Sequence, residues 1–227
     1  MGLDPAQIAE INSYCMRDLP AFPWFLEEFG FIEQEQLRMR LARAFYAARY
    51  IYKLMEALQV AGDELHAHVK FQVIQYASIY EAVISSLLWT KFRDHDRVKT
   101  LENHKSYKKI AGLAGPTKIT YEGEEVSLCV YRDTKTWKNA IKFNDRVDAA
   151  VDIGFVRKAY GEEIKRIYEL RNLTHIEKEA EEEIELEIEN SKVAYRRMQP
   201  FIDDIKKFFR DGSLTPIPSG SSETSQM

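Results

Sequence analysis

Arg171 and His175 are the two residues of this chain whose types and spacing most strongly suggest chemistry. They stand four positions apart on a helix expected to begin near residue 157, so both project from one face, one turn above the other. That face also carries the apolar residues Ile164 and Ile167. An arginine on a buried stripe is unfavourable unless it is paired. The pattern therefore predicts either a structural ion pair or a cleft in which the two charged groups are used.

Glu81 is the expected partner of Arg171. It lies among the apolar positions of a long helix earlier in the chain, where its carboxylate is placed to form a salt bridge with the guanidinium. The structural and the functional interpretations are compatible, because Glu81 can orient Arg171 while His175 carries out the chemistry.

The segment around these residues carries a second signal, Tyr168-Glu169-Leu170-Arg171-Asn172-Leu173-Thr174-His175. It resembles the signature of HEPN domains, an all-α family with an Arg-x(4–6)-His motif that often has Asn after the Arg. The resemblance covers roughly residues 37–210, with two long helices, then a short helix, then the motif helix. Here three residues separate Arg171 from His175, one fewer than the shortest usual spacing. A helical turn accepts this, since positions i+3 and i+4 share a face.

The resemblance implies a metal-independent endoribonuclease that acts as a homodimer, with both motifs lining one cleft and no cofactor. Arg171 would stabilise the negative charge of the phosphorane, and His175 would be the general base or acid for attack by the ribose 2′-hydroxyl. Asn172 would fix the orientation by hydrogen bonding, and Glu81 would hold Arg171. The substrate would be RNA, because DNA lacks the 2′-hydroxyl. Such enzymes serve as toxins or anti-phage effectors, restrained by an antitoxin or sensor protein in another chain.

Two other functions are consistent with the sequence. The chain is alternatively a non-catalytic HEPN-like module that dimerises or docks a partner, with the Arg171–Glu81 pair purely structural. The apolar residues near the N-terminus favour this, since they can cover a partner surface. A third alternative is a helical protein that binds a small molecule or nucleotide.

Charge is segregated along the chain. Residues 177–189 hold eight Glu and one Lys, whereas residues 91–109 hold seven Lys or Arg and three acids. Each run is either a solvated surface or an interaction surface. The acidic run would be an interaction or self-shielding segment, and the basic run would contact phosphates. The candidate nucleic-acid-binding residues in the basic run are Lys99, Lys105, Lys108 and Lys109.

Composition and periodicity predict a mainly all-α fold, an antiparallel helical bundle with a small β-hairpin insertion. The chain has 12 Phe and 12 Tyr for a core but only 10 Gly and 7 Pro among its 227 residues, which favours long helices. Residues 1–36 are an aromatic and Pro-rich segment expected to pack on the bundle of residues 37–210, and residues 211–227 are an expected disordered tail. Apolar alternation around Glu122-Gly123 predicts the hairpin at about 118–131.

The expected helices have recognisable boundaries. A helix of about 25 residues ends at Gly62, and a second spans roughly 65–93, so the two form an antiparallel pair. A short helix capped by Asn144 or Asp145 ends at Gly154. After the motif helix, a last helix covers about 190–210, and Pro200 kinks it or marks its start.

Other signatures are absent from the sequence. It contains no Gly-rich phosphate loop, Cys-x-x-Cys, His-Glu-x-x-His or Gly-x-Ser-x-Gly motif. His66 and His68 would point apart on a helix, so no metal site is expected. Cys15 and Cys129 are expected to be unpaired thiols in a reducing compartment. No signal peptide or membrane-spanning stretch is expected, and the predicted location is the cytoplasm.

Overall fold

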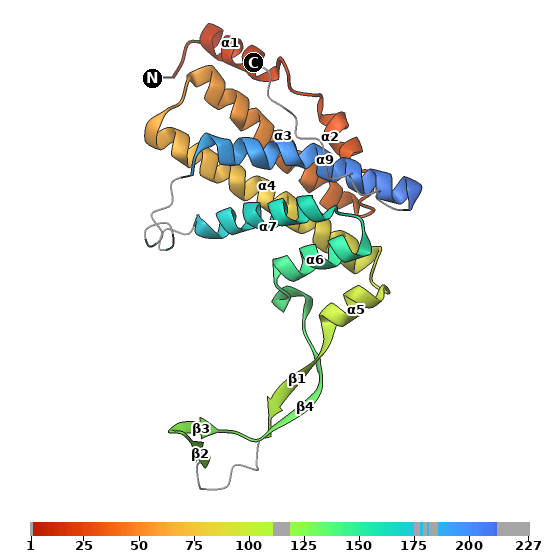
Figure 1. The fold of residues 1–227 in the computed structure, drawn as a ribbon. Helices are drawn as coiled ribbons and strands as arrows, with labels where there is room; N and C mark the ends of the chain where they lie inside the picture. Colours follow the sequence, from red (N-terminus) through yellow and green to blue (C-terminus); the bar gives the residue numbers. More distant parts are fainter. Residues whose placement is uncertain (1, 111–118, 175–177, 179–180, 182–185, 213–227) are drawn as a thin grey trace, which may run out of the picture.

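The computed structural model describes residues 2–110, 119–174, 178, 181 and 186–212. The predicted fold class is confirmed, because helices dominate and the strands form only small antiparallel pairs (Figure 1). The helices are α1 (Pro5–Met16), α2 (Phe22–Glu28), α3 (Glu35–Leu58), α4 (Gly62–Thr90), α5 (Asp96–Glu102), α6 (Phe143–Ile153), α7 (Lys158–Leu173) and α9 (Ile188–Asp211), with a short 3₁₀ turn, η1 (Lys138–Ala140).

The long helices α3 and α4 form the antiparallel pair that the apolar periodicity predicted, and α7 and α9 pack against α4 (Figure 1). Their apolar faces meet in one core that includes large aromatic side chains, among them Phe45, Tyr76, Tyr80, Phe155 and Phe201. The predicted helix end at Gly62 is wrong. Helix α3 ends earlier, where Gln59 adopts a left-handed conformation, and Gly62 begins α4.

The N-terminal segment forms two short helices that lie against α3. Asp4 and Gln7 close a reciprocal capping box at the start of α1. Phe25 in α2 and Phe29, the residue directly after that helix, are fully buried. Both make edge-to-face contacts with Phe45 on α3, at centroid distances of 5.3 Å and 6.2 Å. These rings therefore extend the core of the bundle rather than forming one of their own.

Helices α6 and α7 approach each other closely. A Cβ atom on Gly161 would lie 2.7 Å from the Val151 side chain, so only glycine fits there without movement. Gly154 ends α6 in the left-handed conformation, as predicted. The predicted caps Asn144 and Asp145 are wrong, because they lie inside the first turn, where an acidic residue favours the helix dipole.

Helix α9 runs without interruption from Ile188 to Asp211, so Pro200 lies inside it and is not its start. The start is instead fixed by a capping box between Glu187 and Asn190. At the other end Gly212 caps the helix, and the rest of the expected disordered tail, residues 213–227, lies outside the described residues.

A β-ribbon extends away from the bundle (Figure 1). Strand β1 (Asn103–Lys109) pairs with β4 (Cys129–Lys135), and β2 (Ile119–Tyr121) pairs with β3 (Glu124–Val126). We call residues 103–110 and 119–135 the arm. The predicted turn is confirmed, since Glu122 and Gly123 have the positive φ values of 51° and 85° expected of a tight hairpin. The predicted bounds of 118–131 are too narrow, because β1 was not expected to be a strand.

Candidate functional site

The predicted ion pair between Arg171 and Glu81 is present. Arg171, in the last turn of α7, donates from Nη1 to Glu81 Oε2 on α4 at 3.2 Å. The Arg171 side chain is 33% exposed and the Glu81 side chain 28%. The pair therefore lies at the edge of the bundle, within reach of a ligand, and not in its core.

A second arginine shares the same carboxylate. Arg146 of α6 lies 3.7 Å from Glu81 Oε1 through Nη1, and the same nitrogen donates to Ser85 Oγ at 2.9 Å. Sequence reasoning missed Arg146. The available signal was its place in α6, directly before Val147 and four positions before Ala150, both of which are fully buried. Its side chain is accordingly only 11% exposed.

Tyr168 completes this arrangement. Its hydroxyl donates to Glu81 Oε1 at 3.4 Å, and its ring lies 5.0 Å below the Arg171 guanidinium. The ring also packs against Phe143, with centroids 4.2 Å apart. We call Glu81, Arg146, Tyr168 and Arg171 the Glu81 cluster. Two guanidinium groups around one carboxylate leave the cluster with an excess positive charge, and their orientation is fixed by the fold.

The remaining motif residues are not all brought into this cluster. Asn172 is half-buried at the next position of α7. The helix is described as far as Leu173, and Thr174 donates from Oγ1 to the Arg171 carbonyl at 2.6 Å. His175, the predicted general acid or base, lies outside the described residues. The structure therefore positions the cation of the motif and its carboxylate partner.

The basic run divides between two elements. Lys99 lies on α5 with its side chain 4.0 Å from Asp96, whereas Lys105, Lys108 and Lys109 are exposed on β1. Their strand partner β4 adds Arg132 and Lys135. The described strands β1 and β4 together carry five Lys or Arg and one Asp. A positive surface is thus present, but it is the stem of the arm and not a helix.

One face of this stem combines cations with aromatic rings. Tyr107 lies directly opposite Tyr131 across the strands, with ring centroids 4.9 Å apart. Lys105 and Lys109 are on the same face, two positions to either side of Tyr107. Both rings are exposed, at 74% and 58%. The two rings are tilted by 41° to each other. Exposed aromatic rings between lysines are the kind of surface on which single-stranded nucleic acids bind.

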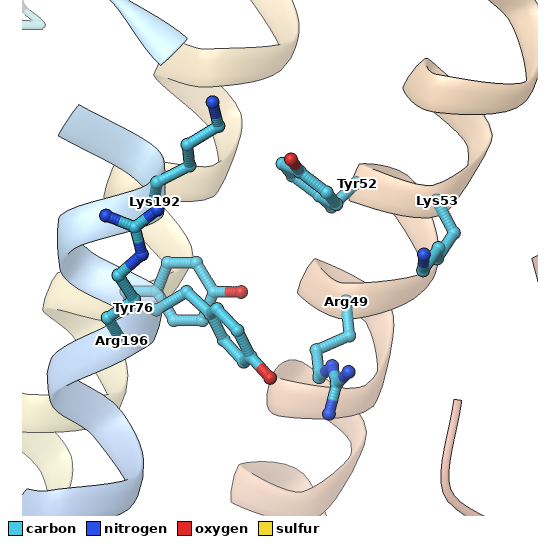
Figure 2. Close-up of a pocket in the computed structure, with 7 residues that line it drawn as sticks. Arg49, Tyr52, Lys53, Tyr76, Lys192 and Arg196 are labelled. Carbon is cyan, nitrogen blue, oxygen red and sulfur yellow. The ribbon is translucent and has the colours of Figure 1, made fainter. Parts of the chain in front are cut away.

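A cationic cavity of about 260 Å³ lies between α3, α4 and α9 (Figure 2). Sequence reasoning missed it. It is lined by four cations and three tyrosines, Arg49, Tyr52, Lys53, Tyr76, Lys192, Tyr195 and Arg196. The signal was a five-residue pattern that occurs on two helices distant in the chain: a cation, two other residues, a tyrosine and a second cation. The pattern spans residues 49–53 on α3 and 192–196 on α9.

Burial affects the tyrosines of this cavity. It raises the pKa of the Tyr76 hydroxyl well above its ordinary value. The pKa of Tyr52 is also raised, by burial and then by the nearby Glu56 carboxylate, which accepts a hydrogen bond from it. Both groups therefore stay protonated at neutral pH and act as neutral hydrogen-bond donors or acceptors.

Comparisons with protein-family models, with curated proteins and with solved structures give no match. Within the described parts of the chain, no three His, Cys, Asp or Glu side chains group in a way that could hold a metal ion. None of the helices described is long and apolar enough to cross a membrane.

Proposed function

We propose that this protein is a metal-independent endoribonuclease of the HEPN type that acts as a dimer. Arg171 stabilises the charge on the phosphorane, His175 transfers the proton of the ribose 2′-hydroxyl, and Asn172 orients the phosphate. The observation that carries the proposal is the Glu81 cluster, in which a carboxylate on α4 holds Arg171 of the motif at 3.2 Å while a third of its side chain stays exposed.

The cluster has the electrostatics that phosphoryl chemistry requires. A guanidinium stabilises a transition state best when it is oriented before the substrate arrives, because no reorganisation is then needed. Glu81 and the ring of Tyr168 provide this orientation. A carboxylate alone would cancel the charge of Arg171, but Arg146 on the other oxygen offsets it. The cluster thus keeps net positive charge for a phosphate.

The stem of the arm supports the choice of RNA as the substrate. Lysines Lys105, Lys108 and Lys109 would neutralise phosphates, while Tyr107 and Tyr131 would stack on unpaired bases. The RNA would therefore be single-stranded where it meets the arm. In this proposal the protein is a toxin or anti-phage effector, and an antitoxin or sensor protein in another chain restrains it.

The test is cleavage of total RNA in excess EDTA by the wild type and the His175→Ala and Arg171→Ala variants. We expect fragments from the wild type, with 2′,3′-cyclic phosphate ends, and from neither variant. Arg166→Ala is the matched control, because Arg166 is exposed on the same helix and the same charge is lost. An all-deoxy substrate should stay intact. Equal cleavage by wild type and His175→Ala would contradict the assigned role of His175.

One contact favours the alternative of a non-catalytic module for dimerisation or partner binding. Arg146 Nη2 donates to the carbonyls of Lys138, at 3.1 Å, and Ile141, at 2.9 Å. These residues lie where the chain returns from the arm to the bundle, so Arg146 anchors that connection to Glu81. If the cluster has only this structural role, Arg171→Ala should lower the free energy of unfolding, and no RNA should be cleaved even by the wild type.

A further inference from the structure

We infer that the cavity between α3, α4 and α9 binds a small organic phosphate of the nucleoside monophosphate class. This site is separate from the proposed nuclease site, and its argument does not depend on RNA cleavage. It rests on the charge, the pairing and the size of the cavity.

The charged side chains that line the cavity are all positive. Four of the seven lining residues are cationic, the other three are tyrosines, and none of those described is a carboxylate (Figure 2). Figure 2 shows that the cations come from opposite walls, Arg49 and Lys53 from α3 and Lys192 and Arg196 from α9. Bringing like charges together around a hollow is unfavourable unless anionic groups, from the protein or from a ligand, balance them.

Arg49 differs from the other three cations in its ion-pair partners. Carboxylates outside the lining pair with the other three: Lys53 lies 2.9 Å from Glu56, and Arg196 and Lys192 lie 2.9 Å and 3.8 Å from Glu189. Within the described chain, Arg49 has no carboxylate partner. It makes a long hydrogen bond of 3.4 Å to the Asp18 carbonyl and lies 4.9 Å above the ring of Tyr195.

This arrangement suits a phosphate monoester. A guanidinium without an anionic partner binds two phosphate oxygens at once, and its stacking on an aromatic ring holds it in place for that contact. Tyr76 also lines the cavity, and its protonated hydroxyl is an additional donor. The rings of Tyr52 and Tyr195, which are partly exposed, give an apolar surface suited to a base.

The volume of the cavity limits the size of the ligand that it can enclose. About 260 Å³ is slightly below the usual range for sites that enclose drug-sized molecules. A single nucleotide is therefore favoured over a dinucleotide cofactor or a polymer. The cations would contact the phosphate, and the base would lie against the tyrosines.

The test is isothermal titration calorimetry of the full chain, without RNA, using AMP, UMP, adenosine and inorganic phosphate as probes. We expect at least one of the two nucleotides to bind, and adenosine and inorganic phosphate to bind at least about tenfold more weakly. Arg49→Gln should weaken nucleotide binding by about tenfold or more, as expected for loss of a charge-assisted hydrogen bond.

Arg43→Gln is the matched control, because Arg43 is exposed on the same helix and the same charge is removed. Its affinity for the nucleotide should equal that of the wild type, and both variants should have the wild-type melting temperature. Arg171→Ala should also bind normally, which separates this site from the nuclease site. The inference would be overturned by absence of binding of both nucleotides, by equal affinity for a nucleotide and inorganic phosphate or adenosine, or by equal binding in the Arg49 and Arg43 variants.

Discussion

The helical bundle and the arm are stabilised in opposite ways. In the bundle, α3, α4, α7 and α9 bury their apolar faces in one core. In the arm, none of the residues whose burial is described is buried, and the strands are held by backbone pairing and by side-chain contacts such as the 2.7 Å hydrogen bond between Ser106 and Thr134. Two strands alone are marginally stable in water.

Because of this difference, the bundle and the arm place different requirements on their residues. Bundle residues are selected for shape and for paired charges, because burial penalises any misfit. Arm residues are free of that requirement, so exposed lysines and tyrosines there are available for a partner. Substitutions should therefore affect stability in the bundle and binding in the arm.

The largest expected effect is from Phe45→Ala in the bundle. The Phe45 ring contacts the rings of Phe25, Phe29 and Tyr76, so its removal leaves a cavity at the junction of three helices. The free energy of unfolding in urea should fall by about 3–5 kcal/mol. Tyr131→Ala in the arm is the matched aromatic truncation and should change it by less than about 0.5 kcal/mol. Similar losses in both variants would show that the arm contributes to the core.

A slightly smaller effect is expected from Arg157→Ala. Arg157 Nε donates to Asp204 Oδ2 at 2.6 Å, and the Asp204 side chain is only 7% exposed. Truncation leaves a buried carboxylate without its cation, at a cost of about 3 kcal/mol. Replacing both residues with leucine should recover most of that loss, as measured by chemical denaturation. A double variant as unstable as the single one would contradict the pairing.

Glu81→Gln should have an intermediate effect. It removes the charge that holds Arg146 and Arg171, but both pairs lie at a partly exposed edge, where solvent screens the interaction. We expect a loss of about 1–2 kcal/mol in the free energy of unfolding. The exposed pair of Lys99 and Asp96 provides the control, since Asp96→Asn should be nearly neutral.

The pH dependence of stability should report on Asp204. Burial raises the pKa of this carboxyl above its ordinary value of 3.8, and the Arg157 guanidinium opposes the rise. The folded protein thus holds the proton more tightly than the unfolded chain. This contribution to stability is fully present below the ordinary pKa and is lost as the pH rises through the higher pKa of the folded state.

Asp204→Asn removes this titration. The free energy of unfolding of the variant, relative to wild type, should therefore increase as the pH is raised from about 3.8 into the range above it. Urea denaturation of both proteins across the acidic range measures the difference. A difference that stays constant or falls with pH would contradict the assignment.

Replacing the outer arm, residues 106–132, should have the smallest effect on stability. Lys105 and Asp133 lie directly opposite each other, so an Asn-Gly turn can join them and replace the outer arm. The free energy of unfolding should change by less than about 0.5 kcal/mol. RNA binding at low salt should weaken and become less salt-dependent, because Lys108, Lys109 and Arg132 are lost. A large loss of stability would instead show that the arm packs as part of the fold.

Much of the bundle was predictable because the spacing of apolar residues along a helix can be recognised within a short stretch of sequence. The apolar spacing located α3, α4, α7 and α9 to within a few residues, and the positive-φ turn at Glu122-Gly123 followed from its residue types. Strand β1 was not predicted. Both of its faces are solvated, so Asn-His-Lys-Ser-Tyr-Lys-Lys shows no alternation of apolar and polar residues.

The sequence by itself determined that Arg171, a charge on an otherwise apolar stripe, needs an anion, and that Glu81 is placed to supply it. Only the tertiary structure decided that Arg146 would join the same carboxylate, and that Arg49 on α3 and Arg196 on α9 would line one cavity. The physical reason is that a side chain's preference for burial or pairing is a local property. Its partner is chosen by how helices distant in the chain pack, and that choice depends on the whole core at once.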